Sequence, residues 1–320
     1  YLFCAIRRPD GYVGKPPELG TGVFAMDTGN SSSTIPTFDS GFPVDFAFER
    51  TYASTQSWYT GARLISGKYL TLNSNGAEGN ASDHTFDSNT GWQKSGYNTT
   101  HQSWMWSRRG QSFDVVTYAG NGDADRSIPH SLNKTVEMAW VKRRDAAAQW
   151  QVYHKGLNGG TNPQGHGIIL TNSAEYTETT AWAETAPTST HFFVGENAGT
   201  NSSGYNFLAL LFASVEGISK VGYYTGNGQA RTISTAVGTH PGFQPRFILV
   251  KNIDQDQNWF ILDTTRGWGS GNDPYLNLNS NAVQNSGDDL GAPTSTGFTW
   301  SGGGGMNNNN GDNYIYYCHA

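Results

Sequence analysis

A short acidic pattern is the first feature of this chain whose residue types and spacing could do chemistry. Asn121, Asp123 and Asp125 lie one residue apart, with Gly122 inside the pattern. Amide and carboxylate oxygens at such spacing are ligands that Ca²⁺ uses in loop sites. Asn-Gly is also the strongest signal for a tight hairpin turn, and the matching residues 227–231 have neither acid. We therefore expect a turn, with Ca²⁺ bound at Asn121, Asp123 and Asp125 as the open alternative.

Patterns for the common catalytic chemistries are weak. His154 and His166 fall in one predicted loop region, without a glutamate or cysteine at a metal-ligand spacing. There is no Gly-x-Ser-x-Gly sequence, and the glycines at 302–305 are not followed by the Lys-Ser/Thr of a phosphate loop. Asp288 and Asp289 are typical of a solvated loop, and no two carboxylates can be paired across a groove from sequence. We expect no catalytic residues, no enzyme activity and no cofactor other than the Ca²⁺ considered above.

Tryptophans offer binding chemistry of a different kind, because an indole ring can stack on the face of a sugar. Four of them lie near predicted turns or at the edges of repeated units: Trp58, Trp92, Trp268 and Trp300. Packing at interfaces is the favoured interpretation, since indoles are common there, and glycan stacking by these four rings is the alternative. Five others stand at repeated strand positions and are predicted to be core residues: Trp104, Trp106, Trp140, Trp150 and Trp259.

The elements that would position these residues recur along the chain at a spacing of about 105 residues. Ala-Pro-Thr-Ser-Thr occurs at 186–190 and again at 292–296, and Gly-Asn-Gly occurs at 120–122 and 226–228. A weaker third copy begins at Asp27. A chain built from one module three times is expected to present a surface and not to enclose a single active-site pocket.

Each copy has the same predicted order of strands. Aromatic and β-branched runs of about four to eight residues, bounded by Gly, Asn, Ser and Thr, are strand signals. An apolar strand is predicted at 44–48, 136–141 and 247–250, and an aromatic closing strand at 103–106, 207–212 and 314–317. The chain is therefore predicted to be all-β, with three tandem, jelly-roll-like β-sandwich modules. Their predicted limits are 21–113, which is divergent, 114–216 and 217–320.

The first residues match a closing strand although no module precedes them. Either the chain is cut from a longer protein, as the missing initiator methionine would suggest, or this orphan strand pairs elsewhere in the assembly. We expect pairing in the assembly, because an uncovered apolar edge strand is a liability. Residues 1–20 would then be an orphan strand and linker, with these assembly residues: Tyr1, Leu2, Phe3 and Ile6.

Composition narrows the class of protein further. Aromatic residues make up 13% and charged residues only 14% of the chain, and the low charge favours large subunit interfaces or a surface of amides and hydroxyls. The net charge of −6 argues against nucleic-acid binding. No apolar stretch approaches the roughly 18–20 residues of a membrane span, so no membrane insertion is expected. Two cysteines, Cys4 and Cys318, do not make a disulfide framework.

The order of these motifs resembles a repeat domain of unknown function found in tail-fibre and other structural proteins of marine and environmental tailed bacteriophages. The motifs are a Tyr-Thr-Gly-Asn-Gly turn at 224–228, a Gly-Phe-Gln-Pro lead-in at 242–245, an ILVKN strand at 248–252, a YLNLN strand at 275–279 and a YIYY strand at 314–317. The likeness covers nearly the whole chain and is weakest in the first module. It implies folds of the lectin-type jelly-roll kind and brings no catalytic residues.

The repeat and the resemblance together predict a non-enzymatic virion structural protein. It would be a tail-fibre or appendage segment that mediates assembly and host-surface adhesion, made in the host cytoplasm and located in the virion. The expected partners are copies of itself, with a trimer favoured because phage fibres commonly are trimers, other virion proteins and a host-surface glycan. The alternatives are a carbohydrate-binding module array, a polysaccharide depolymerase, or a capsid decoration or filament-forming subunit.

Overall fold

The computed structural model describes residues 19–171, 173–269 and 271–320. Within these residues there are short 3-10 turns but no α-helix, and the regular structure is antiparallel β-sheet. The prediction of an all-β fold with sandwich-like modules is confirmed. The predicted assembly strand (Tyr1, Leu2, Phe3 and Ile6) and Cys4 lie outside the described residues.

Three large antiparallel sheets carry the fold, and each takes its strands from one third of the chain. In sheet order, the first comprises β1 (Phe24–Thr28), β8 (His101–Trp106), β3 (Phe46–Thr51), β4 (Tyr59–Ala62), β5 (Lys68–Thr71) and β6 (Gly79–Asn80). The second comprises β9 (Phe113–Ala119), β16 (Asn206–Phe212), β11 (Met138–Arg143), β12 (Gln151–His154), β13 (His166–Ile169) and β14 (Tyr176–Thr177). The third comprises β17 (Ser219–Thr225), β24 (Asn313–His319), β19 (Phe247–Asn252), β20 (Phe260–Asp263) and β21 (Tyr275–Asn277). The strand order is therefore the same in all three: first, last, then the inner strands in sequence.

A small sheet covers the outer face of each large one. These are β2 (Phe38–Asp39) with β7 (Gly91–Trp92), β10 (Arg126–Pro129) with β15 (His191–Val194), and β18 (Arg231–Ser234) with β23 (Gly297–Trp300) and β22 (Pro293–Thr294). We call each large sheet with its small sheet a module, numbered 1 to 3 along the chain. Each module encloses a core of its own.

The large sheets are apolar on both faces, as β19 illustrates. Ile248 and Val250 point into the core of module 3, whereas Phe247 and Leu249 point into a core shared by all three modules. Alternate side chains of a strand face opposite sides of its sheet, so a continuous apolar run requires a cover on each side. Module 3 supplies one cover with its small sheet, and modules 1 and 2 supply the other.

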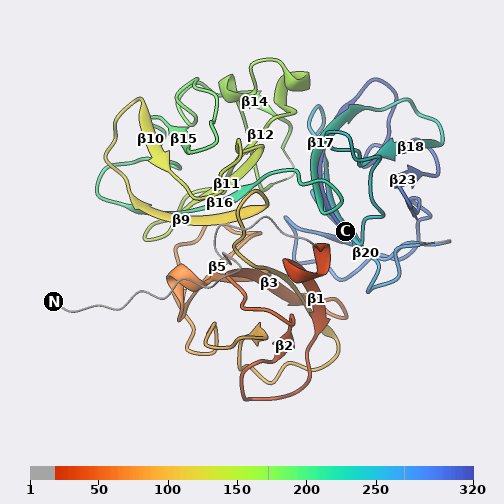
Figure 1. The fold of residues 1–320 in the computed structure, drawn as a ribbon, viewed down its shortest axis with the longest axis horizontal. Helices are drawn as coiled ribbons and strands as arrows, with labels where there is room; N and C mark the ends of the chain where they lie inside the picture. Colours follow the sequence, from red (N-terminus) through yellow and green to blue (C-terminus); the bar gives the residue numbers. More distant parts are fainter. Residues whose placement is uncertain (1–18, 172, 270) are drawn as a thin grey trace.

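The shared core lies where the three large sheets meet, and Figure 1 shows the modules arranged around this centre. Aromatic rings from different modules are in contact there: the ring centroid of Phe212 is 5.0 Å from that of Tyr317, and the centroid of Trp106 is 5.9 Å from that of Phe247. Buried aromatic pairs of this kind contribute more than their area alone. The modules are thus joined by a common hydrophobic interior.

A ring of tryptophan hydrogen bonds closes this arrangement. The indole N–H of one tryptophan in each module donates to a backbone carbonyl of the preceding module, and module 1 donates to module 3. The bonds run from Trp150 to Thr71 (3.0 Å), from Trp259 to Ile169 (3.0 Å) and from Trp58 to Asn277 (2.9 Å). The three acceptors occupy the same place in the sheet register, opposite Tyr59, Gln151 and Phe260. The contacts therefore have approximate threefold symmetry within one chain.

A second ring uses backbone groups only. Glu78 N donates to Arg144 O (2.6 Å), Glu175 N donates to Ile253 O (2.8 Å), and Gln284 N donates to Tyr52 O (3.1 Å). These three bonds again join module 1 to 2, module 2 to 3 and module 3 to 1. Since both rings are cyclic, no module is left at an open end.

Among the described residues no helix is long or apolar enough to cross a lipid bilayer.

Candidate functional site

The four tryptophans considered for glycan stacking are not at the surface. All are at most 3% exposed: Trp58, Trp92, Trp268 and Trp300. Trp58 belongs to the shared core, and the other three fill the space between a large sheet and its small sheet. Their indole N–H groups are bonded internally, for example Trp92 to Ser103 Oγ at 2.9 Å and Trp268 to Gly291 O at 2.8 Å. The stacking prediction is therefore wrong, because a sugar cannot reach these ring faces.

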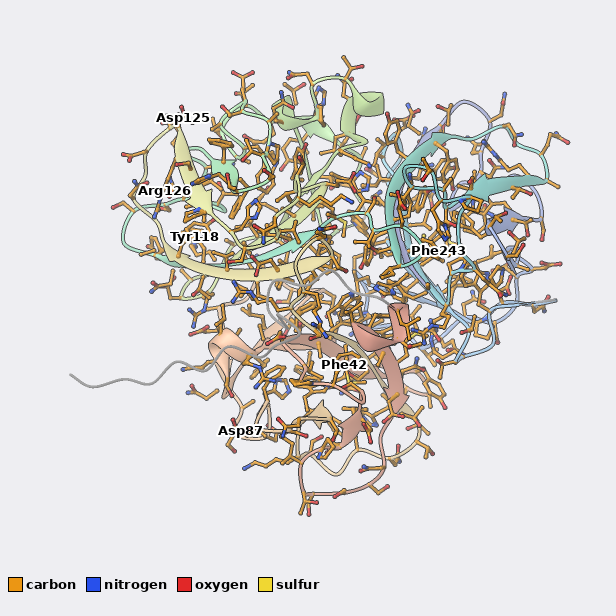
Figure 2. The ribbon with its side chains drawn as sticks, in the orientation of Figure 1. Phe42, Asp87, Tyr118, Asp125, Arg126 and Phe243 are labelled. Atoms are coloured by element: carbon orange, nitrogen blue, oxygen red, sulfur yellow. The ribbon has the colours of Figure 1, made fainter. Side chains whose placement is uncertain are left out.

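The acidic pattern near residue 121 is a hydrogen-bonded turn. Asn121 Oδ1 accepts from Asp123 N (3.1 Å) and from the side-chain amide of buried Asn201 (2.9 Å). Asp125 is exposed at the outer edge of module 2, next to Arg126, whose guanidinium donates to Asn201 Oδ1 at 2.9 Å (Figure 2). In the described chain no group of three His, Cys, Asp or Glu side chains could hold a metal ion.

The same turn occurs in module 3 without acidic residues. Asn227 Oδ1 accepts from Gln229 N (3.1 Å) and from the side-chain amide of buried Asn308 (2.9 Å). Because the bonding is the same where both acids are missing, the buried asparagine holds the turn and no ion is needed. The structure thus places Asn121, Asp123 and Asp125 in a turn that is held by hydrogen bonds within the protein.

Replacing Asn201 by alanine is expected to lower the free energy of unfolding by about 1–3 kcal/mol, since several buried polar groups lose their partners. Chelator or added calcium should leave the melting temperature of the unaltered protein unchanged. Thermal unfolding with EDTA and with CaCl₂ checks both statements, and exposed Asn310→Ala is the matched control. A melting temperature that rises with calcium would contradict this account of the turn.

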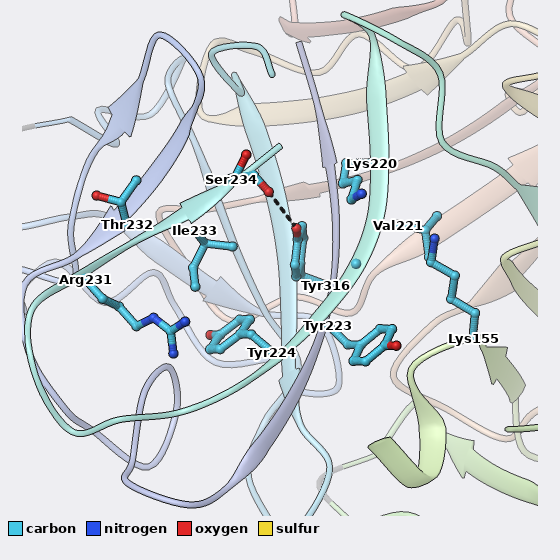
Figure 3. A pocket seen from close by; sticks show the side chains of 11 residues that line it. Lys155, Lys220, Val221, Tyr223, Tyr224, Arg231, Thr232, Ile233, Ser234 and Tyr316 are labelled. Atoms are coloured by element: carbon cyan, nitrogen blue, oxygen red, sulfur yellow. Dashed lines mark hydrogen bonds between the residues drawn. The ribbon is translucent and has the colours of Figure 1, made fainter. Parts of the chain in front are cut away.

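The strongest candidate for a ligand site is a groove between modules 2 and 3, with a volume of about 320 Å³ (Figure 3). Three cationic side chains line it: Lys155, which follows β12, Lys220 of β17 and Arg231 of β18. Tyr223, Thr232 and Ser234 also line it, and the hydroxyl of buried Tyr316 donates to Ser234 O at 3.3 Å. The groove therefore combines positive charge with aromatic and hydrogen-bonding surface.

Each cation in the groove is held in place. Lys155 Nζ is 2.6 Å from Glu137 Oε1, Lys220 Nζ donates to Ala236 O at 2.8 Å, and Arg231 Nη1 donates to Thr225 O at 2.6 Å. Burial lowers the pKa of Lys220, and the neighbouring positive charge of Lys155 lowers it further. Among the described residues only Lys155 forms an ion pair with a carboxylate; Lys220 and Arg231 donate to backbone carbonyls, and the Arg231 guanidinium also lies 5.4 Å from the centroid of the Tyr224 ring.

Tyr223 forms an exposed aromatic wall of the groove, with 47% of its surface accessible. Its ring lies against glycines at the turn η3 (Leu157–Gly160) of module 2. A Cβ atom added to Gly156 would lie 2.5 Å from Tyr223 Cβ, and one added to Gly160 would lie 2.5 Å from the Tyr223 hydroxyl oxygen. Only glycine leaves room for this approach, so module 2 determines where the ring of module 3 sits.

Comparison with known families gives one match. Residues 91–320 match the model of a domain of unknown function, DUF7483. The chain belongs to this family. No curated protein matches the chain. The matched residues include every residue that lines the groove of modules 2 and 3, and they begin where β7 of module 1 begins.

Buried polar side chains distinguish module 1. Glu49 of β3 is fully buried, where the corresponding residues of β11 and β19 are Val141 and Val250. Within the described chain neither Glu49 carboxyl oxygen has a hydrogen bond of normal geometry, and buried Gln93, with a φ of 64°, has an unpartnered side-chain amide. Unpaired buried groups and left-handed backbone at a non-glycine residue both cost stability.

The buried position of Glu49 changes the pKa of its carboxyl group. Burial raises the pKa of this carboxyl well above its ordinary value of 4.5, the nearby charge of Asp83 raises it further, and the Tyr97 hydroxyl offsets this only in part. The folded state therefore binds a proton more tightly than the unfolded state does. Stability from this group is fully present below pH 4.5 and decreases as the pH rises towards the raised pKa.

Glu49→Gln is expected to remove this pH dependence. The stability of the variant relative to the unaltered protein should increase from pH 4.5 upwards, by about 1.4 kcal/mol for each unit by which the pKa is raised. Urea unfolding across that range measures the difference, and exposed Glu216→Gln is the control. A difference that does not change with pH would show that Glu49 is not perturbed by burial.

Lys155, Lys220, Tyr223 and Arg231 are not marked by the sequence pattern. Tyr223 lies on the same face of β17 as Val221, which is buried in the shared core, so strand alternation would have predicted burial for it as well. The partner glycines come from another module, and sequence does not show that they meet.

Proposed function

We propose that this protein is a non-enzymatic structural component of a tailed-phage virion, a tail-fibre or appendage segment that mediates assembly and host-surface adhesion. The motif order that resembles repeat domains of phage structural proteins supports this proposal. The observation that carries it is the pair of cyclic hydrogen-bond rings, with the large sheets buried at the centre. Three modules joined in this way form a unit that is rigid at its centre. Its small sheets, loops and inter-module grooves remain accessible to partners.

The proposed partners are copies of the chain, as a trimer, and other virion proteins. Because the large sheets already cover one another within the chain, contacts between copies would use the outer surface. Sedimentation velocity of the full chain tests this part: a trimer is expected, and a monomer at micromolar concentration would contradict it.

Immunogold electron microscopy of purified virions tests the proposed function. Antibodies raised against the full chain are expected to label the tail or an appendage, and the free protein is expected to compete with virions for adsorption to host cells. Label on the capsid would favour the alternative of a decoration subunit. Virions without any label would overturn the proposal.

A second candidate, a carbohydrate-binding module array, is favoured by one observation. The groove of modules 2 and 3 has an exposed aromatic wall beside hydroxyl and cationic side chains. Concave sites with a few convergent polar groups are where small ligands bind.

A further inference from the structure

We infer that the groove between modules 2 and 3 binds a carboxylate-bearing saccharide, such as a uronic-acid unit of a surface polysaccharide. This inference rests on the proposed adhesive function and names the ligand class of its site. It is carried by three observations: the charge of the groove, the way Tyr223 is seated in it, and the difference from the related groove of modules 1 and 2.

The charge of the groove is opposite to that of the chain. The chain carries a net charge of −6, yet Lys155, Lys220 and Arg231 line this groove and none of its described lining residues is acidic. Glu137 pairs with Lys155, and among the described residues the other two cations form no ion pair with a carboxylate. A carboxylate in the groove would complete their pairing with charge-assisted hydrogen bonds. Positive walls around a concave site also concentrate anions there.

Tyr223 supplies the surface for a sugar ring. One part of its side chain is in contact with Gly156 and Gly160, and the rest is open to the groove. The glycine contacts hold the ring before a ligand arrives, which lowers the entropic cost of binding. Thr232 and Ser234 of β18, both exposed, also line the groove. Tyr223 and Lys155 lie on one side of the edge strand β17, and Arg231 lies on the other side (Figure 3). The groove therefore suits a saccharide chain that crosses the edge of the sheet and carries acid groups.

The groove of modules 1 and 2, with a volume of about 340 Å³, is a natural comparison within the same molecule. The sheet registers place Asp114 where module 3 has Lys220, and Thr117 where it has Tyr223. Arg108 lines the groove of modules 1 and 2 and forms an ion pair with Asp114, so the positive charge of Arg108 is already neutralised. The charge and the aromatic wall therefore occur together at modules 2 and 3. We expect one saccharide site in each chain.

Isothermal titration calorimetry of the full chain with oligogalacturonate tests the inference. Neutral maltooligosaccharide and polyglutamate serve as comparison ligands. Binding of oligogalacturonate at one site per chain, weakened by added salt, is the expected result. Equal binding of the neutral sugar would overturn the requirement for an acid group. Equal binding of polyglutamate would overturn the choice of a saccharide, and no binding of oligogalacturonate would overturn the inference itself.

Two variants locate the site. Tyr223→Ala and Arg231→Gln are each expected to weaken binding by about tenfold or more, the equivalent of one lost aromatic contact or charge-assisted bond. Tyr176→Ala, at another exposed tyrosine of module 2, is the matched control and should bind as the unaltered protein does. Arg231→Gln keeps the test valid if Tyr223→Ala unfolds. Unchanged binding by both variants would place the ligand elsewhere and overturn the inference.

The outcome is separable from that of the proposed function. Virions that carry the label, with a protein that binds no oligogalacturonate, would leave the structural role standing and overturn the saccharide site. Oligogalacturonate binding at this groove, with unlabelled virions, would support the saccharide site and overturn the structural role in the virion.

Discussion

Trp150→Ala is expected to lower the free energy of unfolding by about 3–5 kcal/mol, the usual cost of emptying a buried tryptophan site. Trp150 is buried in the shared core, and its indole N–H bonds to module 1. The substitution therefore removes core volume from two modules and one bond of the tryptophan ring. Urea unfolding, followed by tryptophan fluorescence and by circular dichroism, measures the loss.

Two comparisons show whether the ring acts as a unit. Trp58→Ala and Trp259→Ala should cost about the same as Trp150→Ala, because the three residues have equivalent positions and bonds. Trp150→Phe should cost less, since it keeps an aromatic ring and loses the indole N–H. All variants should unfold in one transition, because the modules share one core. Separate transitions for separate modules, or a cost below about 1 kcal/mol for Trp150→Ala, would contradict this description of the centre.

Arg50→Ala is expected to lower the free energy of unfolding by about 3 kcal/mol or more, because it empties a buried site and removes three hydrogen bonds between modules 1 and 3. Arg50 is fully buried in module 1, and its guanidinium reaches carbonyl oxygens of module 3. The acceptors are Ser280 O (3.3 Å), Asn281 O (3.3 Å) and Ala282 O (2.8 Å). Burial, with Arg266 nearby, lowers the pKa of Arg50 to about 10, so the group stays charged at neutral pH. Urea unfolding at pH 7 measures the effect.

The chain contains its own control for Arg50. Lysines stand at the corresponding positions of the other modules, and Lys142 Nζ donates across to Asn75 O of module 1 at 3.0 Å. Arg50→Lys should therefore retain part of the stability that Arg50→Ala loses. If Arg50→Lys and Arg50→Ala cost the same, the stability would depend on the guanidinium group of Arg50 itself, and a lysine ammonium could not replace it at this position.

The tryptophans illustrate how far sequence reasoning reaches. Rings in the middle of repeated strands, such as Trp104 and Trp150, were predicted to be core and are buried. Rings near turns, such as Trp92 and Trp268, were considered for a surface role and are buried too. Nearness to a turn does not determine which way a ring points. The small sheets decide that, because they fold back over the outer face of each large sheet.

The burial of Glu49 and the residues that meet at the groove are two further features that the sequence did not predict. Glu49 lies in an apolar strand, and its depth depends on β2 and β7, which cover that face of module 1. The groove is lined by Lys155 of module 2 and Arg231 of module 3, and the packing of the modules decides that both line it. Neither the depth of a single carboxylate nor a meeting of distant residues follows from local periodicity.

By itself, the sequence determined the all-β class and the recurring order of strands, because alternation and turn residues act over a few neighbouring positions. The sequence also predicted apolar strands at 44–48, 136–141 and 247–250, and the structure shows that such strands are covered on both faces. The sequence did not show what the second cover would be, since another module and another copy of the chain offer the same kind of surface. Only the tertiary structure decided this, by packing the three large sheets against one another and closing them with two rings of hydrogen bonds.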